Sequence, residues 1–237
     1  MKHIDGMIDN IANPDLRKAI EEDRVIEWAI AYYRTLSPMD VALLSTLLTC
    51  NERYAIMEAQ SNPEGDPIKS LNIRDSFAVV PYFLSNLSRY IELENYEDIL
   101  IDVWTRGEAG QFHQDDWAKA LAQADPDKLR AAGDSIPPDK IVNGKVIAFR
   151  GASEGFGKGI SWTLSKRTAE QFALMKWRCY DQDGSFVGFG ANPKPVIYQS
   201  VIPVEDIIWY SDERSEQELI VRDLPQVKII KRFTRES

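Results

Sequence analysis

Ser135-Ile136-Pro137-Pro138-Asp139 separates two parts of the sequence that differ in character. Two adjacent prolines with polar neighbours are typical of a boundary, because proline cannot donate the backbone hydrogen bond that helix interiors and central strands require. After this segment come short apolar runs typical of strands, beginning with Val146-Ile147-Ala148-Phe149. Further strands are expected at 196–203, 206–210, 217–222 and 227–232. One helix is expected among them, at about 166–178, with Ser165 as its N-cap.

The part of the chain before this boundary, residues 1–135, is predicted to be mainly helical. Apolar residues recur at helical spacing over 14–60, 85–106 and 115–132. Trp104 and Trp117 are candidates for its core. The expected fold class is therefore α+β, with a helical N-terminal domain at 1–135 and a β-rich domain at 141–237.

The two parts also differ in charge. The 237 residues carry a net charge of −9, and residues 141–237 contain 14 Lys and Arg against 12 Asp and Glu. The β-rich part is thus +2 and residues 1–140 are −11. Net negative charge argues against direct nucleic-acid binding, which needs clustered Lys and Arg. The acidic part is expected either to steer towards a basic or nucleic-acid-associated protein partner, or to cap the β-rich part with an ordinary solvated surface.

Several site classes are excluded by composition. His3 and His113 lie far apart and no Cys/His cluster is present, so no metal site is expected. No apolar run approaches the ~18 residues that a membrane span needs, and Met1 to Gly6 does not resemble a secretory signal. A cytoplasmic protein without membrane contact is therefore expected.

A glycine cluster, Gly155-Phe156-Gly157-Lys158-Gly159, follows the first strand. A dinucleotide-binding fingerprint would require glycine at position 160, which is Ile, and a phosphate-binding loop would require Ser or Thr directly after Lys158. The cluster is therefore interpreted as a flexible turn between strands.

Three polar motifs lie on or beside predicted strands. Phe149-Arg150-Gly151 ends one strand, Gly159-Ile160-Ser161-Trp162-Thr163 forms a second, and Ser215-Glu216-Gln217-Glu218 begins another. Because side chains alternate along a strand, Glu216 and Glu218 are expected on one face. Two carboxylates so placed repel each other, which is costly unless they serve a function or remain solvated.

This order of Arg, Ser-x-Thr and Glu-x-Glu resembles the Arg-Ser-Glu class of mono-ADP-ribosyltransferases. The chain is most similar to small bacterial and phage-encoded members, which share the Phe-Arg-Gly strand, the Gly-x-Ser-Trp-Thr strand and a helix ending in Phe-Ala, here Phe172-Ala173. The resemblance covers about residues 145–232. It implies an ADP-ribosyltransferase fold and a glycosyl-type transferase for which NAD is a substrate rather than a redox cofactor.

The resemblance also implies roles for the motif residues that bind NAD. Arg150, with Gly151, would hold NAD through a phosphate or the adjacent ribose. Ser161 would position the active-site carboxylate or the nicotinamide ribose, and Thr163 would support that region. Glu218 would hold the ribose hydroxyl and stabilise the oxocarbenium-like ribose that forms when nicotinamide leaves.

The first acid of the pair is expected to act on the acceptor. Glu216 would orient and deprotonate the incoming nucleophile. In the family, Glu at this position accompanies arginine acceptors, so transfer to a protein arginine is expected.

Two further segments are expected near the site. Trp209-Tyr210-Ser211-Asp212-Glu213-Arg214 matches the target-recognition turn of the family, which makes Tyr210 and Arg214 candidate acceptor contacts. The alternative is an ordinary polar turn with Trp209 in the core. The Gly-rich stretch 183–195 is expected to be a loop, either one that closes over nicotinamide with Phe186 or Phe189 stacking on it, or a plain connection.

Two other functions remain open at this level. The same residues would serve an NAD glycohydrolase toxin or effector that transfers ADP-ribose to water. They would also be present in a catalytically inactive binding protein of the same fold.

Overall fold

The computed structural model describes residues 14–22, 29, 48, 50–76, 78–107, 114–180, 186–192, 194–213, 215–223 and 225–233. The chain divides into two compact units. The first is Met1–Arg74 with Tyr180–Val187, and the second is Asp75–Cys179 with Gly188–Ser237. This division differs from the predicted domains 1–135 and 141–237, because the helices from Val79 onwards belong to the same unit as the main sheet.

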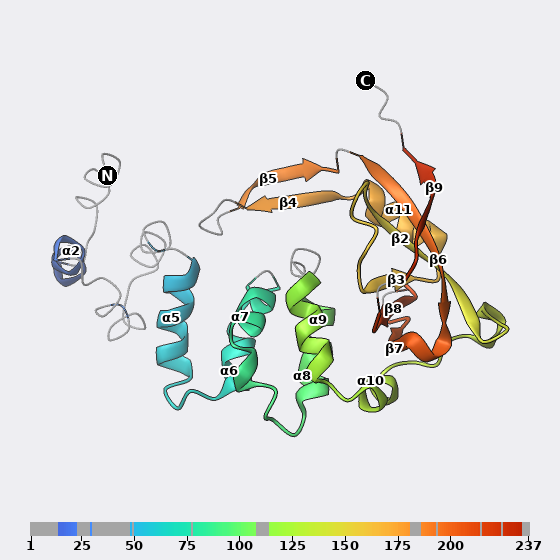
Figure 1. Ribbon diagram of the computed structural model, residues 1–237. Coiled ribbons are helices and arrows are strands. Elements are labelled where there is room, and N and C mark those ends of the chain that lie inside the picture. Colours follow the sequence, from blue (N-terminus) through green and yellow to red (C-terminus); the bar gives the residue numbers. More distant parts are fainter. Residues whose placement is uncertain are drawn as a thin grey trace. The chain divides into compact units, whose positions relative to one another are not determined.

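The first unit contains three helices among its described residues, α2 (Pro14–Glu21), α5 (Cys50–Ser61) and α6 (Pro67–Asn72) (Figure 1). Helix α6 begins where Asp66 accepts hydrogen bonds from the backbone N–H groups of Ile68 and Lys69, which satisfies donors that a helix start leaves unpaired. An ion pair of 2.7 Å between Arg74 and Glu58 joins the end of α6 to α5.

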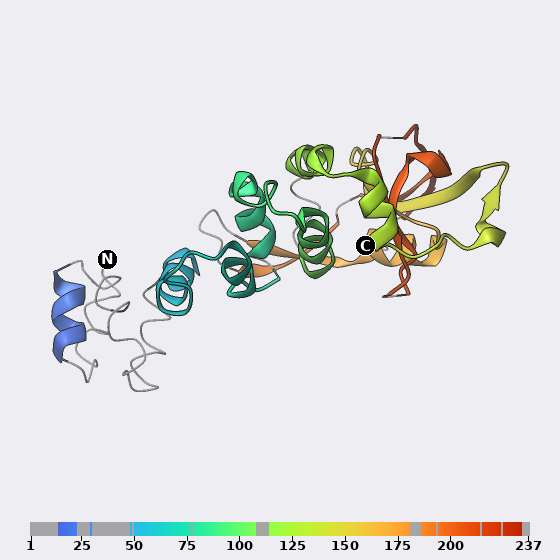
Figure 2. The same cartoon turned by 90° about the horizontal axis from the view of Figure 1, so that it is seen from below.

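The second unit begins with helices α7 (Val79–Ser85), α8 (Tyr96–Arg106), α9 (Gln114–Gln123) and α10 (Pro126–Ala132). The first three contribute rings to an aromatic cluster. The ring of Phe83 lies 6.0 Å from that of Trp117, which is fully buried as predicted. Trp104 packs edge-on against Trp117 with ring centroids 4.8 Å apart, but is only half-buried. Figure 2 shows these teal-to-green helices side by side.

The change from helices to strands lies where it was predicted. Among the described residues the first strand begins at Ile141, directly after a short 3-10 helix at Pro138–Lys140. The strands of the main sheet are β1 (Ile141–Val142), β2 (Lys145–Ser153), β3 (Ser161–Thr163), β6 (Pro195–Pro203), β7 (Ile207–Ser211), β8 (Glu218–Val221) and β9 (Lys228–Arg232). The predicted strands are thus present to within one or two residues, and the α+β class is confirmed.

The main sheet is antiparallel at every described pairing and has the order β7-β8-β3-β2-β6-β9, with β1 paired to β2. This order places the short strand β3 between β2 and β8, so the Arg motif, the Ser-x-Thr motif and the Glu-x-Glu motif lie on adjacent strands.

Helix α11 (Lys166–Leu174) packs on strands β2 and β6 (Figure 1). Ser165 caps it as predicted, with its hydroxyl accepting from the N–H of Thr168 at 3.2 Å. The helix ends four residues earlier than expected, because β4 (Lys176–Tyr180) follows directly. Gly151 permits the close packing, since a Cβ there would lie 1.9 Å from the carbonyl oxygen of Ala169.

Strand β4 pairs with β5 (Phe186–Ala191) in a separate two-stranded sheet. The loop expected over 183–195 is therefore wrong for residues 186–191. Phe186, Val187 and Phe189 favour a strand, and pairing with β4 outweighs the glycines between them.

Helix α10 attaches the helices to the edge strand β7. Arg130 donates to the carbonyl oxygens of Ile207 (3.1 Å) and Glu205 (2.9 Å). The N–H of Asp134, just after the helix, donates to the carbonyl oxygen of Tyr210 at 2.7 Å. These bonds occupy backbone groups that an edge strand would otherwise expose.

Among the described residues we find neither a membrane-spanning helix nor a cluster of metal ligands. None of their helices combines the length and the apolar character needed to cross a membrane. No group of three or more His, Cys, Asp or Glu among them is arranged to hold a metal ion.

Candidate active site

Strands β3, β8 and β7 bring the candidate residues onto one face of the sheet. Glu218 pairs with Thr163 on one side and with Ser211 on the other, and directly opposed residues of an antiparallel pair share a face. Ser161 lies two residues before Thr163 and therefore shares that face. Its hydroxyl donates to Glu218 Oε1 at 2.7 Å. The structure thus brings Ser161 and Glu218 into direct contact.

Thr163 supports the turn before Glu218 rather than lining an open space. The residue is buried, and its hydroxyl donates to the carbonyl oxygen of Glu216 and accepts from the N–H of Ser165 at 3.0 Å. One side chain therefore ties the Glu-x-Glu turn to the start of α11.

The turn itself has a strained backbone. Ser215 and Gln217 have φ angles of 54° and 49°, in the left-handed region, which costs a non-glycine residue about 1–2 kcal/mol. The carbonyl oxygen of Gln217 accepts from the N–H of Leu164 at 3.0 Å, which helps hold this conformation. Such strain is typical of functional sites.

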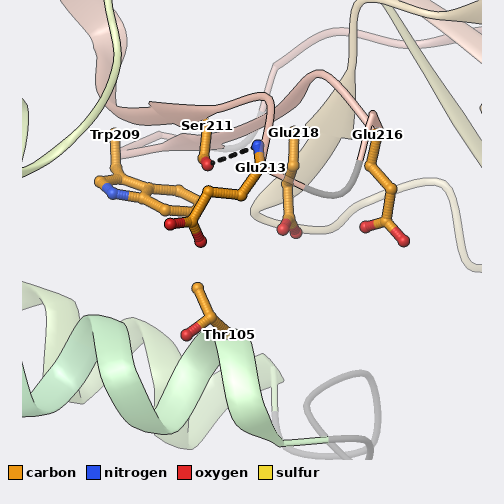
Figure 3. Close-up of a pocket in the computed structure, with 6 residues that line it drawn as sticks. All are labelled: Thr105, Trp209, Ser211, Glu213, Glu216 and Glu218. Carbon is orange, nitrogen blue, oxygen red and sulfur yellow. Dashed lines mark hydrogen bonds between the residues drawn. The ribbon is translucent and has the colours of Figure 1, made fainter.

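Glu216 lies in the strained turn and not in the strand where it was expected. Strand β8 begins only at Glu218, so Glu216 is not related to Glu218 by strand alternation. Both nevertheless line the same pocket, because the left-handed residue between them turns the chain (Figure 3).

This pocket is lined by Thr105, Trp209, Ser211, Glu213, Glu216 and Glu218, and its empty space of about 230 Å³ includes open solvent. Figure 3 shows Thr105 on its helix facing the carboxylates of Glu213 and Glu218. Three carboxylates around one pocket favour a cationic group. Because this space is partly open to solvent, the pocket is a shallow recess beside the carboxylates and not an enclosed cavity.

Arg150 reaches the site from the other face of the sheet. Phe149 pairs with Thr163, so alternation directs Arg150 away from the face of Glu218. Its guanidinium donates to the backbone carbonyl oxygen of Ser161 at 2.7 Å. Burial lowers the pKa of Arg150 to about 10, although the charge of Glu218 acts in the opposite direction. The group remains a cation at neutral pH.

The glycine cluster forms the connection between β2 and β3, and its last residue, Gly159, packs against Arg150. A Cβ on Gly159 would lie 2.4 Å from the guanidinium carbon of Arg150. The loop is also tied to β6, because the Tyr198 hydroxyl accepts from the N–H of Gly155 at 2.8 Å and donates to the carbonyl oxygen of Ser153 at 3.2 Å. The cluster connects β2 and β3 as predicted, and Gly159 allows close packing on Arg150, whereas a Cβ on Gly155 would meet nothing within 4 Å.

Trp104 is a site residue that the sequence did not reveal. Its indole Nε1 donates to Glu218 Oε1 at 3.2 Å. It was expected in the core of the helical part, and its spacing on α8 carries no signal of a contact 114 residues away along the chain.

Other expected site residues have different surroundings. Gly151 lies against the backbone of α11. Tyr210 is 3% exposed, so the exposed recognition role expected for it is wrong. Its position in β7 directs it into the core, where burial and then the charges of nearby aspartates raise its pKa.

The remaining candidates cannot be placed at the site. Arg214 lies outside the described residues, and so do the side chains of Phe186 and Phe189, whose backbones belong to β5.

A scan against protein-family models, a search of the curated proteins and a search of the solved structures each find no match to this chain.

Proposed function

We propose that the protein is an NAD-dependent mono-ADP-ribosyltransferase, with an ADP-ribosyltransferase fold in the sheet and α11, that transfers ADP-ribose to an arginine side chain. The observation that carries the proposal is the 2.7 Å hydrogen bond from Ser161 to Glu218. It joins the Ser-x-Thr and Glu-x-Glu motifs in one site, and Arg150 is bonded to the backbone of the same serine.

The reaction breaks the bond between nicotinamide nitrogen and ribose C1′, and nicotinamide leaves with the electron pair. The carboxylate of Glu218 stabilises the positive charge that develops on the ribose. A guanidinium nitrogen of the acceptor then forms the new bond to C1′, and its proton passes to Glu216.

The carboxylates of the pocket support arginine as the acceptor. Glu213, Glu216 and Glu218 line the same pocket, and a planar guanidinium pairs well with carboxylates. Glu216 lines the same pocket, which supports its role as the acceptor of the proton.

Labelled NAD tests the proposal. The protein is incubated with labelled NAD and a cell lysate, and Glu218→Gln is compared with the parent. We expect label on protein arginines, and a loss of about a thousandfold in the variant because the charge that stabilises the transition state is removed.

Glu94→Gln is the matched control, since Glu94 is exposed and does not line the pocket, and it should label like the parent. If the label is found only in free ADP-ribose, the protein hydrolyses NAD and does not transfer ADP-ribose to a protein. If the parent protein consumes no NAD, the proposal is wrong, and the alternative of a catalytically inactive binding protein is supported.

A further inference from the structure

Two hydrogen-bond donors converge on one oxygen of Glu218. Ser161 donates from β3 at 2.7 Å, and Trp104 donates from α8 at 3.2 Å, both to Oε1. The two donors come from opposite sides of the helix-to-strand boundary. Because an indole N–H can only donate, the contact favours the ionised form of the carboxylate.

Packing restrains the position of the Trp104 ring. It lies edge-on against Trp117, which is fully buried, and the hydroxyl of Tyr96 on the same helix donates to the carbonyl oxygen of Ala120 at 2.8 Å. The indole therefore reaches Glu218 from a helix that is anchored in its own core.

A second contact joins the helices to the site. The side chain of Gln114, at the start of α9, accepts from the N–H of Ile160 at 3.2 Å. Ile160 directly precedes Ser161, so the helices contact the Ser161–Glu218 pair at two points, the backbone beside Ser161 and the carboxylate of Glu218.

We propose that Trp104 is a positioning residue of the active site, which acts with Ser161 to orient the Glu218 carboxylate and keep it ionised. Helix α8 is then a part of the catalytic centre and not only a cap. This inference rests on the proposed transferase function.

Trp104→Phe tests it, because the change keeps an aromatic ring against Trp117 and removes the N–H. Nicotinamide release is measured with NAD and free arginine as acceptor. We expect kcat to fall by about ten- to hundredfold, as for other small misplacements of a catalytic group, with little change in KM for NAD. We also expect the acid limb of the pH profile to move to higher pH, because the carboxylate loses a donor to its ionised form.

Trp104→His should restore part of kcat. The imidazole overlays the five-membered half of the indole, with a nitrogen at the position of Nε1, so the donor is kept while the ring shrinks. Phe83→Leu is the stability control, since Phe83 is fully buried in the same aromatic cluster. It should lower the melting temperature without moving the pH profile.

If Trp104→Phe does not fold, indole N–H resonances of the parent and of Glu218→Ala are compared by NMR. One indole resonance is expected to move upfield when its acceptor is removed, and the absence of any such response would overturn the inference.

The two proposals fail in different ways. A parent that releases no nicotinamide ends the transferase proposal. An active parent whose Trp104→Phe variant keeps the same kcat and pH profile ends only the role of Trp104. A higher kcat in the variant, as expected for a side chain that blocks the site, also ends it.

Discussion

Ser161 and Trp104 donate to the same oxygen of Glu218, yet they come from regions that differ in how they are built. Ser161 lies on β3, whose register with β8 places it beside Glu218. Trp104 lies on α8, and its position depends on how the helices pack on Trp117 and attach through α10 to β7. Motifs in a sequence can indicate which strands pair. The position of a docked helix depends instead on the packing of many core residues. The experiments below separate these two kinds of contribution.

Gly151→Ala should have the largest effect on stability and tests the β2–α11 contact. A Cβ would lie 1.9 Å from the carbonyl oxygen of Ala169, so α11 would have to shift. We expect a loss of about 3 kcal/mol, the upper part of the usual range for overpacking, measured by urea unfolding. Gly144→Ala is the contrast, because a Cβ there meets no atom within 4 Å and only its φ of 71° is unfavourable. It should cost about 1 kcal/mol, and equal losses in the two variants would contradict the packing role of Gly151.

Glu216→Gln separates acceptor chemistry from NAD cleavage. The variant loses the base beside Glu218 but keeps both described donors to Glu218. We expect arginine labelling to fall by about a hundredfold, the usual size of general-base catalysis, while nicotinamide release to water stays within about threefold. An equal loss in both assays would show that Glu216 has no separate role in activating the acceptor.

Thr163→Val tests the bond between the Glu-x-Glu turn and α11. The change is nearly isosteric but leaves the carbonyl oxygen of Glu216 and the N–H of Ser165 without the hydroxyl that they now contact. We expect about 2 kcal/mol of lost stability and about a tenfold loss of activity as the turn loosens. Thr163→Ser, which keeps a hydroxyl, should recover most of the activity. A Val variant as active as the parent would assign Thr163 to stability alone.

Glu97→Gln should have the smallest effect and concerns the helices alone. Burial alone would raise the pKa of Glu97, but hydrogen bonds from the N–H of Asp125 and from Lys128 lower it below its ordinary value of 4.5. A carboxyl whose pKa is lowered on folding stabilises the protein above pH 4.5, and this contribution is lost as the pH falls through the lowered value.

The variant is therefore expected to be about 1 kcal/mol less stable at pH 7, with the difference shrinking below pH 4.5. Chemical denaturation at several pH values measures both. A difference that does not change with pH would mean that the loss comes from packing and not from the charge.

Local sequence patterns were sufficient for the strands of the main sheet and for the start of α11, but not for β4 and β5. The prolines at 137 and 138 marked the change to strands, runs of β-branched residues marked β6 to β9, and Ser165 marked the start of α11. These features depend on backbone propensity and capping, which act over a few residues. The contact between Ser161 and Glu218 is one of the two roles that the family resemblance implied for Ser161, and the pairing of β3 with β8 produces it.

Only the tertiary structure shows the contacts of two glycines and two aromatic residues of the β-rich part and its neighbouring helix. Gly151 and Gly159 permit close packing against α11 and Arg150, Tyr210 is buried, and Trp104 contacts Glu218. The sequence by itself determined the α+β class and the positions of the main-sheet strands, because these depend on neighbours along the chain. It could not determine which helix completes the site, because that depends on packing between residues more than a hundred positions apart.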